Sequence, residues 1–327
     1  MTDSTVLRAR TPDDLLALVP RFLGFHPEDS LVVVSVGQAG RAVHARVDLP
    51  PPEHLEAVCA HLAGVAERGG VVAVAVVLYT DDGPHAVRAT RALDRALGAV
   101  GCEVVVAVRA DGSRWWALGT PEADGPGTAY DLSTHPMTVD GVVEGRVVLP
   151  SRDALVASLA PDPDAVLATT RWVVETVHDL YARVAERRDL VTEGRWVRHR
   201  VRRFLENGLP LDASELARLV LMVHRTVEVR DVAWAEMDHA SALRHVALWS
   251  DVVRRTPAEL LAAPATLLAF AAWLSGHGAL AWCGVELAQQ ADPDYSLAAL
   301  LAHVLGAGLP PHVWEPLGEE HLTLFET

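Results

Sequence analysis

The apolar run VVAVAVVLY, residues 71–79, constrains the fold of this chain more than any other stretch. A strand that is apolar on both of its alternating faces has to be covered on both faces, as strands are in α/β sheets. Helical patterns flank it at residues 52–70 and 83–101, and a further strand pattern follows at residues 102–109. This succession predicts an α/β N-terminal domain in which helices connect the strands.

Two more strand patterns precede the first of these helices. SLVVVSV (30–36) and RAVHARVDL (41–49) are separated only by GQAG, which predicts a leading β-hairpin. Single-helix crossovers join parallel strands, so residues 41–49 and the two later strands should run in one direction, and residues 30–36 in the other. The expected sheet is therefore mixed and mostly parallel.

A short strand is predicted after the turn at Asp111-Gly112, a dipeptide that favours a tight hairpin. Its adjacent residues Trp115 and Trp116 should point to opposite faces, because side chains alternate along a strand. One ring is expected to fill the core. The other is expected to lie beneath the loop of residues 119–134 or to line a pocket.

The pattern changes near residue 162, after which helical periodicity alone remains. The predicted helices span residues 163–188, 192–207, 212–228, 239–255, 257–275, 278–291 and 295–307. We therefore predict two domains, an α/β sandwich domain over residues 1–155 and an all-α helical bundle over residues 156–327.

The last helices contain a mild periodic feature. Ala281, Ala288 and Pro293 match small-residue and proline positions of the tetratricopeptide pattern. The helical domain is therefore expected to contain tetratricopeptide-like helix pairs. Surfaces of that kind often bind proteins, so the expected partner is a protein, either a second copy of this chain or another one.

Charge and composition exclude several classes of protein. The 327 residues carry 43 acidic and 28 basic side chains, for a formal net charge of -15, so binding to nucleic acid is not expected. No apolar run is long enough to span a membrane, and the first residues lack the apolar core of a secretory signal, which predicts a cytoplasmic protein. Cys59, Cys102 and Cys283 lie far apart and form no disulfide framework or zinc motif.

The expected strand directions bring four polar loops to one edge of the sheet. These loops are HPEDS (26–30), DLPPP (48–52), TDDGPH (80–85) and RADGSR (109–114). In open α/β sheets ligands usually bind at this carboxyl edge, so the loops form the candidate site. Its candidate residues are His26, Glu28, Asp29, Asp48, Asp81, Asp82, His85, Arg109, Asp111 and Arg114.

Two interpretations of these loops stay open. Carboxylates and imidazoles together could bind a divalent metal or perform acid/base chemistry, with Asp29 or Asp82 as ligand or base and Arg109 holding an anion. Alternatively, the residues only form turns: Asp82 would cap the following helix, and residues 27–30 would satisfy loose backbone groups. No spacing here equals a known metal or nucleophile motif.

Motifs for nucleotide binding and nucleophilic catalysis are missing. The chain contains no GxxxxGK[ST] and no GxSxG, and no GxGxxG follows a strand and opens a helix. Ser30, Ser133 and Ser151 could each meet a histidine in space, but no pattern places one there. No catalytic residue and no cofactor is therefore assigned, apart from the divalent metal considered above.

The stretch RWVRHRVRR (195–203) forms a candidate basic face. Arg195, Arg198 and Arg202 share one side of a helix and could grip a phosphate or the acids of a partner. A run of this kind is more often a solvated face paired with acidic side chains. Arg200 and Arg203 lie around the side of the helix, which favours that second interpretation.

Several stretches together resemble one known family. They are DLLALVPRFLGFHPEDSLVVVSV, VRALDRALGAVG, GRVVLPSRDALVASLAP, TLLAFAAWLSGHGALA and ADPDYSLAALL. They resemble the actinobacterial family catalogued as domain of unknown function 4192, over residues 8 to 311. The resemblance implies an actinobacterial cytoplasmic protein with the same two-part layout, and it implies no activity, substrate or catalytic residue.

Two hypotheses for function follow. The first is a non-catalytic interaction or adaptor protein, because catalytic motifs are missing and the C-terminal half is built of helical hairpins. The alternative is a small-ligand- or metal-binding protein, or a hydrolase-type enzyme, with its site at the carboxyl edge of the N-terminal sheet.

Overall fold

A computed structural model describes residues 9–37, 44–143, 147–184, 186–318 and 322–325. The chain divides into two compact units. The first unit comprises Met1–Leu155 and Ala307–Pro310, and the second comprises Val156–Gly306 and Pro311–Thr327.

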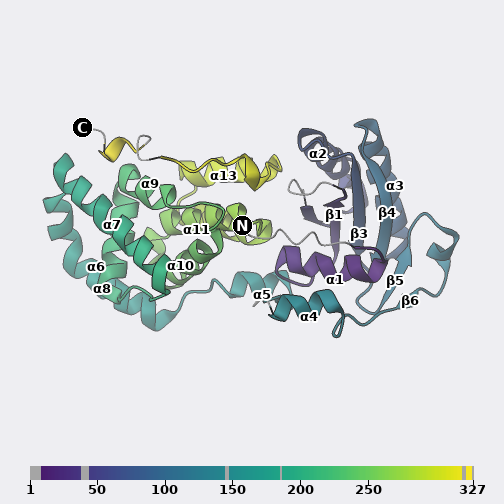
Figure 1. The fold of residues 1–327 in the computed structure, drawn as a ribbon, viewed down its shortest axis with the longest axis horizontal. Helices are drawn as coiled ribbons and strands as arrows, with labels where there is room; N and C mark the ends of the chain where they lie inside the picture. The colour runs from purple at the N-terminus through teal and green to yellow at the C-terminus, as the bar shows by residue number, and fades with distance from the viewer. Residues whose placement is uncertain (1–8, 38–43, 144–146, 185, 319–321, 326–327) are drawn as a thin grey trace. The chain divides into compact units, whose positions relative to one another are not determined.

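The first unit contains the sheet and its covering helices (Figure 1). Its elements are α1 (Pro12–Leu23), β1 (Ser30–Ser35), β2 (His44–Asp48), η1 (Pro52–His54), α2 (Leu55–Arg68), β3 (Ala73–Tyr79), α3 (Gly83–Ala99), β4 (Glu103–Ala110), β5 (Arg114–Ala117), η2 (Pro121–Asp124), β6 (Thr128–Ala129) and α4 (Pro136–Val143). Helix α5 (Arg152–Ala157) follows and crosses the boundary between the units in the sequence.

The sheet is mixed, with the strand order β2-β1-β3-β4-β5-β6. β1 is antiparallel to both β2 and β3, and β3 is parallel to β4. The pairing of β1 with β2 confirms the expected antiparallel partners, although the connecting residues 38–43 lie outside the described residues. β2, β3 and β4 run in one direction as expected, but β1 lies between β2 and β3, so β3–β4 is the parallel neighbour pair among the described strands.

The register brings the polar ends of the strands to one edge. Ser30, at the start of β1, lies opposite both Asp48 at the end of β2 and Tyr79 at the end of β3. Tyr79 in turn lies opposite Ala110 at the end of β4. The loops that enter β1 and leave β2, β3 and β4 therefore meet at the same edge, as the sequence predicts.

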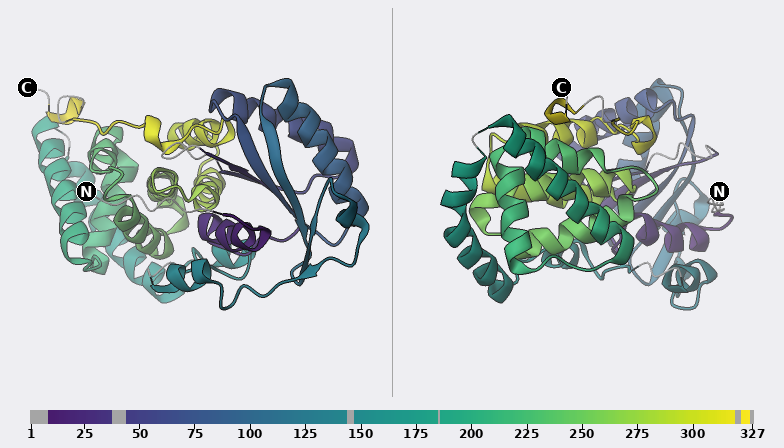
Figure 2. Two further views of the ribbon diagram at one scale, coloured as in Figure 1. Left: turned by 45° about the vertical axis from the view of Figure 1, so that its right-hand side comes forward. Right: turned by 60° about the vertical axis from the view of Figure 1, so that its left-hand side comes forward.

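The two faces of the sheet pack against different helices, as Figure 2 shows. On one face the core contains Leu31, Val76 and Leu78 together with the apolar sides of α2 and α3. On the other face Val32, Val77 and Tyr79 pack with Leu15, Leu16 and Val19 of α1. Alternate residues of the same strands serve the two cores, which explains the uninterrupted apolar run of β3.

Helix α1 begins and ends where its sequence signals predict. Thr11 caps it in a reciprocal capping box with Asp14, and Pro12 occupies the first turn. Gly24 ends it with a positive φ of 79°, and its N–H donates a hydrogen bond to the carbonyl of Pro20. The chain is thereby turned toward the loop that enters β1.

The described part of the second unit is helical. It contains α6 (Pro163–Arg183), α7 (Arg187–Asn207), α8 (Ala213–Arg225), α9 (Val227–Ala235), α10 (Ala242–Arg255), η3 (Ala258–Leu260), α11 (Ala262–Leu274), α12 (Gly278–Ala291), α13 (Ser296–Gly306), η4 (Pro311–Val313) and η6 (Thr323–Phe325). Every residue of α11 is buried, so this helix forms the centre of the unit. Among the described helices, none combines the length and the apolar character that crossing a membrane requires.

The predicted helix over residues 212–228 was wrong at its end, and α9 was missed. Thr226 adopts an extended conformation that ends α8, and its side chain accepts a hydrogen bond from the backbone N–H of Val229, which starts α9. A threonine cap inside an apolar stretch produces this break without any glycine or proline to signal it.

Candidate functional site

A cavity of about 890 Å³ opens at the predicted edge of the sheet, on the face covered by α1. We call its buried lining residues the floor and its exposed lining residues the rim. The floor comprises Leu16, Ala17, Pro20, Arg21, Pro27, Tyr79, Thr80, Ala110 and Gly141. The rim comprises His26, Glu28, Asp29, Asp81, Asp111, Gly112, Asp131 and Ser133. Tyr130, Leu132, Thr138 and Val148 are half-buried between them.

The loop that enters β1 is held by a second segment far along the chain. The N–H of His26 donates to the carbonyl of Leu149 over 2.9 Å, and the N–H of Leu149 donates to the carbonyl of Gly24 over 2.8 Å. Phe25, between them, is buried. The GFHPEDSLV and LPSR stretches, which carry much of the family resemblance, therefore pair with each other beside the cavity.

Asp29 makes the final turn of this loop into β1. Its φ of 39° lies in the left-handed region, which aspartate tolerates better than most residues. Its carbonyl accepts a hydrogen bond from the N–H of Leu49, which ties the loop to the end of β2. The turn places Asp29 at the rim of the cavity.

Half of the predicted site residues line the cavity together. They are His26, Glu28, Asp29, Asp81 and Asp111. They come from three of the four predicted loops, which the sheet topology gathers at this edge.

Asp48, Asp82 and His85 do not line the cavity. Asp48 is 83 % exposed and forms an ion pair with Arg46. Asp82 caps α3 by accepting a hydrogen bond from the N–H of His85, as the alternative interpretation of this loop expects. The imidazole of His85 is buried, and its Nε2 lies 2.9 Å from the carbonyl oxygen of Pro50.

The two predicted arginines also contact protein groups. Arg109 is buried, its Nη1 donates to the carbonyl of Asp81, and its guanidinium stacks on the Trp116 ring. Arg114 donates to the carbonyls of Pro126 and Gly127. Both therefore position loops around the cavity without lining it themselves.

Trp115 and Trp116 point to opposite faces, as predicted. Trp115 packs in the core beneath α1, and its Nε1 donates to Asp13. Trp116 lies under the loop of residues 119–134, where its Nε1 donates to the carbonyl of Gly125. A β-carbon on Gly127 would lie only 2.5 Å from the Trp116 ring, so glycine allows the loop to close over it.

Sequence reasoning missed several polar residues of the lining, among them Arg21, Tyr79, Tyr130 and Asp131. Tyr79 is the last residue of an apolar strand, and Tyr130 and Asp131 belong to a segment that was predicted only as loop. Arg21 offered the clearest signal, because it is a charged residue in the buried stripe of α1. Its Nη1 donates to the carbonyl of Met137, which connects α1 to α4.

Tyr79 is the most unusual of these residues. It is only 8 % exposed, and its hydroxyl is buried without a hydrogen-bond partner in the described structure. Burial, together with the neighbouring Tyr130, raises the pKa of its phenol far above the ordinary value, so the group stays neutral. The cavity is therefore lined by a residue whose neutral, buried hydroxyl has unused hydrogen-bonding capacity.

The rim is strongly acidic. Burial raises the pKa of Asp111, but hydrogen bonds from Ser113 and Arg114 outweigh it and the net shift is downward. Hydrogen bonds from Ser133 likewise lower the pKa of Asp131. Both carboxylates are therefore ionised at neutral pH.

Among the described residues, no three His, Cys, Asp or Glu side chains come together in a way that could hold a metal ion. The carboxylates of the rim place negative charge around the opening of the cavity.

Two of the three serines that were considered as nucleophiles, Ser30 and Ser151, have structural contacts, and the third, Ser133, lies at the rim. Ser30 Oγ donates to the carbonyl of Glu28 and accepts from the guanidinium of Arg46. Ser151 Oγ accepts from the N–H of Ala154 and so caps α5. These contacts belong to turns and caps, and they activate neither hydroxyl.

The candidate basic face in the second unit is largely paired with acids. Arg198 and Arg202 both contact Glu236, the latter through two hydrogen bonds of 2.6 and 3.1 Å. Arg195, the third member, is exposed. The face therefore fits the ordinary interpretation of a helix surface that pairs with neighbouring acids.

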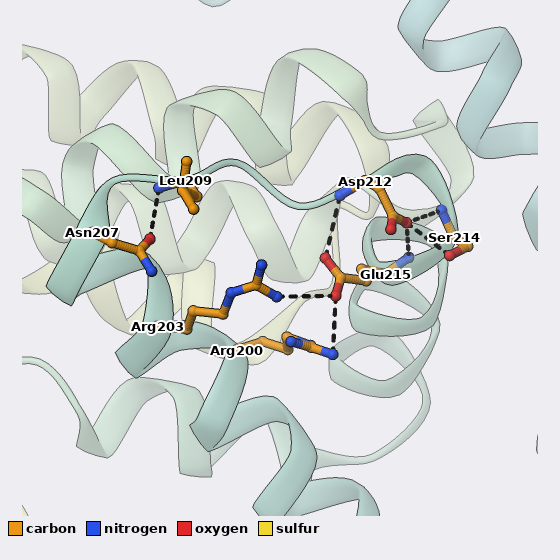
Figure 3. A network of polar contacts seen from close by, with 7 residues as sticks. All are labelled: Arg200, Arg203, Asn207, Leu209, Asp212, Ser214 and Glu215. Carbon is orange, nitrogen blue, oxygen red and sulfur yellow. Dashed lines mark hydrogen bonds and ion pairs between the residues drawn. The ribbon is translucent and has the colours of Figure 1, made fainter.

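The arginines at the side of α7 form ion pairs with a glutamate of α8, as Figure 3 shows. Arg200 and Arg203 both reach Oε1 of Glu215, at 2.9 and 3.5 Å. The other oxygen of Glu215 accepts from the N–H of Asp212, the capping residue of α8. This part of the arginine run therefore orients the start of α8.

The protein is therefore of the α/β-plus-helical class: it has an α/β unit built around a mixed sheet and a second unit whose described part is helical. The candidate ligand site lies in the α/β unit. The chain belongs to the family described as "Domain of unknown function (DUF4192)", whose model matches residues 12–312. No curated protein and no solved structure shows significant similarity to the chain. The family assignment made from the sequence is confirmed, and it supplies no activity.

Proposed function

We propose that this protein binds a small organic molecule in the cavity at the carboxyl edge of its α/β unit. The observation that carries the proposal is the hydroxyl of Tyr79, which is buried beside the cavity without a hydrogen-bond partner in the described structure. The size of the cavity, about 890 Å³, is in the range of ligand pockets.

The argument is energetic. A buried polar group without a partner destabilises a folded protein by about 1–3 kcal/mol, and a phenylalanine ring would fill the same space without that penalty. A bound molecule that reaches the hydroxyl would remove the penalty and gain a hydrogen bond. The Tyr79 hydroxyl therefore lowers the stability of the free protein and would contribute favourably to the free energy of ligand binding.

The test combines a ligand screen with one substitution. Amines, amino acids, nucleosides, sugars and carboxylic acids are screened for their effect on the thermal unfolding of the wild-type chain and of Tyr79→Phe. We expect Tyr79→Phe alone to unfold at a higher temperature than wild type, because it removes the orphaned hydroxyl. A ligand should stabilise wild type by about 2.7 kcal/mol at a hundredfold excess over its Kd, and should stabilise the variant less.

Tyr181→Phe provides the matched control. Tyr181 belongs to α6 in the second unit, where its ring contacts Arg225, and it does not line the cavity. This substitution should leave the effect of the ligand unchanged. A screen in which no class of compound stabilises the protein, or in which Tyr79→Phe responds to the ligand as wild type does, would contradict the proposal.

An interaction or adaptor role remains our second hypothesis, drawn from the helical second unit. The tetratricopeptide-like pairing of its helices, a protein partner and a cytoplasmic location stay predictions. Affinity capture from native lysate and measurement of the mass in solution test them: an adaptor should bring down a stoichiometric partner or associate with itself. Recovery of the chain alone, as a monomer, would argue against this role.

A further inference from the structure

The polar lining of the cavity is asymmetric in charge. The rim holds five carboxylates, and they are Glu28, Asp29, Asp81, Asp111 and Asp131. They come from four separate segments of the first unit, so the fold gathers them from a long stretch of sequence. Arg21 is the one arginine among these lining residues, which include no lysine. It belongs to the floor, so the rim carries negative charge and the floor carries this positive charge.

Not all of these carboxylates are needed by the fold. Asp111 accepts three hydrogen bonds within its turn, and Asp131 accepts hydrogen bonds from Ser133. In the part of the chain that the structure describes, no hydrogen bond or ion pair is formed by the carboxylates of Glu28, Asp29 and Asp81. Those three groups place negative charge at the mouth of the cavity while stabilising no neighbouring turn.

The floor has a different character from the rim. Leu16, Ala17, Pro20 and Ala110 give it an apolar surface, and Tyr79, whose hydroxyl is buried without a partner in the described structure, belongs to the same floor. Tyr130 supplies a second aromatic ring at its side. Aromatic rings attract cations through their faces, and ionised carboxylates form short hydrogen bonds with N–H groups that carry positive charge.

We propose that this cavity, whose role in binding rests on the function proposed above, takes an organic cation. An ammonium or guanidinium group would lie among the rim carboxylates, and an apolar body would lie against the floor within reach of the Tyr79 hydroxyl. Phosphates and carboxylic acids would be repelled by the rim. A bare metal ion would leave the apolar floor unused.

The first test compares molecules that differ in charge and little else. Phenethylamine, 2-phenylethanol and 3-phenylpropionate form one series, and hexylamine, hexanol and hexanoate form another, with agmatine as a guanidinium probe. Binding to the full chain is measured by isothermal titration calorimetry at low and at physiological salt. At least one amine or agmatine should bind at least tenfold more tightly than its neutral and anionic counterparts, and its affinity should fall as salt rises.

The second test removes single charges from the rim. Asp81→Asn and Glu28→Gln should each weaken the binding of the best cation at least fivefold and leave the neutral counterpart unchanged. Asp48→Asn is the matched control, because Asp48 lies at the same edge of the sheet but outside the cavity. It should bind the cation as wild type does. The thermal unfolding of each variant verifies that it is folded.

Other outcomes separate the inference from the proposed function. Equal affinity for charged and neutral probes, preference for the anions, or binding of no cation would overturn the inference. If a neutral or anionic compound binds, and Tyr79→Phe weakens its binding, the proposed function stands. The inference that the ligand is a cation is then overturned. A loss of affinity in Asp48→Asn equal to that in Asp81→Asn would show only a general effect of net charge, and would also overturn the inference.

Discussion

The guanidinium carbon of Arg109 lies 3.5 Å from the centroid of the Trp116 ring, and the two residues lie opposite each other on neighbouring strands. The same guanidinium donates a hydrogen bond of 3.0 Å to the carbonyl of Asp81. This one side chain therefore connects β4, β5 and the loop that follows β3. Its neighbour Asp81 lines the cavity, so Arg109 supports the rim from outside.

Replacement of Arg109 by lysine tests this support. Lysine keeps the charge but cannot stack a planar group on Trp116 while it also reaches the carbonyl of Asp81. We expect Arg109→Lys to lower the free energy of unfolding by about 1–2 kcal/mol, measured by urea denaturation. Arg91→Lys, on an exposed position of α3, should change it by less than about 0.5 kcal/mol. Equal effects of the two substitutions would contradict this structural role.

Gly127 and Gly98 should respond to alanine in opposite directions. Gly127 has a φ of 71°, and a β-carbon there would lie 2.5 Å from the Trp116 ring, so Gly127→Ala should destabilise the protein by about 2 kcal/mol or more. Gly98 lies within α3 with open space around it, so Gly98→Ala should stabilise the protein by about 0.5–1 kcal/mol. Thermal and urea unfolding of both variants measures the difference. Gly127→Ala as stable as wild type would mean that the loop does not close over Trp116 as described.

The fold was predictable because its local signals agree with one another. The alternation of β3 between two cores and the Asp82 cap of α3 both follow from residues that are close together in the sequence. The order of the strands was harder. β2 could pair with β3, or it could lie at the edge of the sheet with β1 between them, as it does in the structure. The choice depends on packing between distant segments, and the hydrophobic periodicity of a single segment contains no information about it.

The cavity was predictable only in its position. Strand direction alone brings His26, Asp81 and Asp111 to one edge, and the structure places all three in the lining. Sequence spacing could not show that Arg109 would turn to Trp116, because that contact depends on the register of β4 with β5. Nor could it show that the Tyr79 hydroxyl would lack a partner, since orphaned groups are defined by their whole surroundings.

Glu215 should stabilise the second unit in two separable ways. It accepts from the N–H of Asp212 and it contacts Arg200 and Arg203 (Figure 3). Glu215→Ala loses both contributions and should lower the free energy of unfolding by about 1–3 kcal/mol. Glu215→Gln keeps a capping oxygen and should lower it by less. Arg203→Ala, at a half-exposed position with a 3.5 Å contact, should change it little.

These three variants are compared by urea denaturation at low and high salt. The part of the effect that comes from the ion pairs should shrink as salt rises, whereas the capping part should persist. Equal losses in Glu215→Ala and Glu215→Gln would assign the whole effect to the arginines. No loss in Glu215→Ala would contradict the network altogether.

His245 should make the stability of the protein depend on pH below neutrality. Burial lowers the pKa of its imidazole from 6.5 to about 4, against the opposing effects of Glu236 and Asp238. Nε2 lies 3.0 Å from the carbonyl of Glu236, and Nδ1 is buried without a partner in the described structure, so the ring is held neutral. The added proton would occupy Nδ1, where no acceptor meets it.

The sign of the effect follows from the two pKa values. Above pH 6.5 the imidazole is neutral in both the folded and the unfolded chain, and its contribution to stability is fully present. Between pH 6.5 and about 4 the unfolded chain takes up a proton that the folded protein does not, so stability falls, by about 3 kcal/mol in all. His245→Gln cannot titrate, and its stability should fall less steeply over that range. The free energies of unfolding of the two proteins, measured by urea denaturation from pH 7.5 to 4, should therefore converge or cross as the pH is lowered. Parallel pH profiles for wild type and His245→Gln would mean that the ring is accessible to water and titrates near its ordinary pKa.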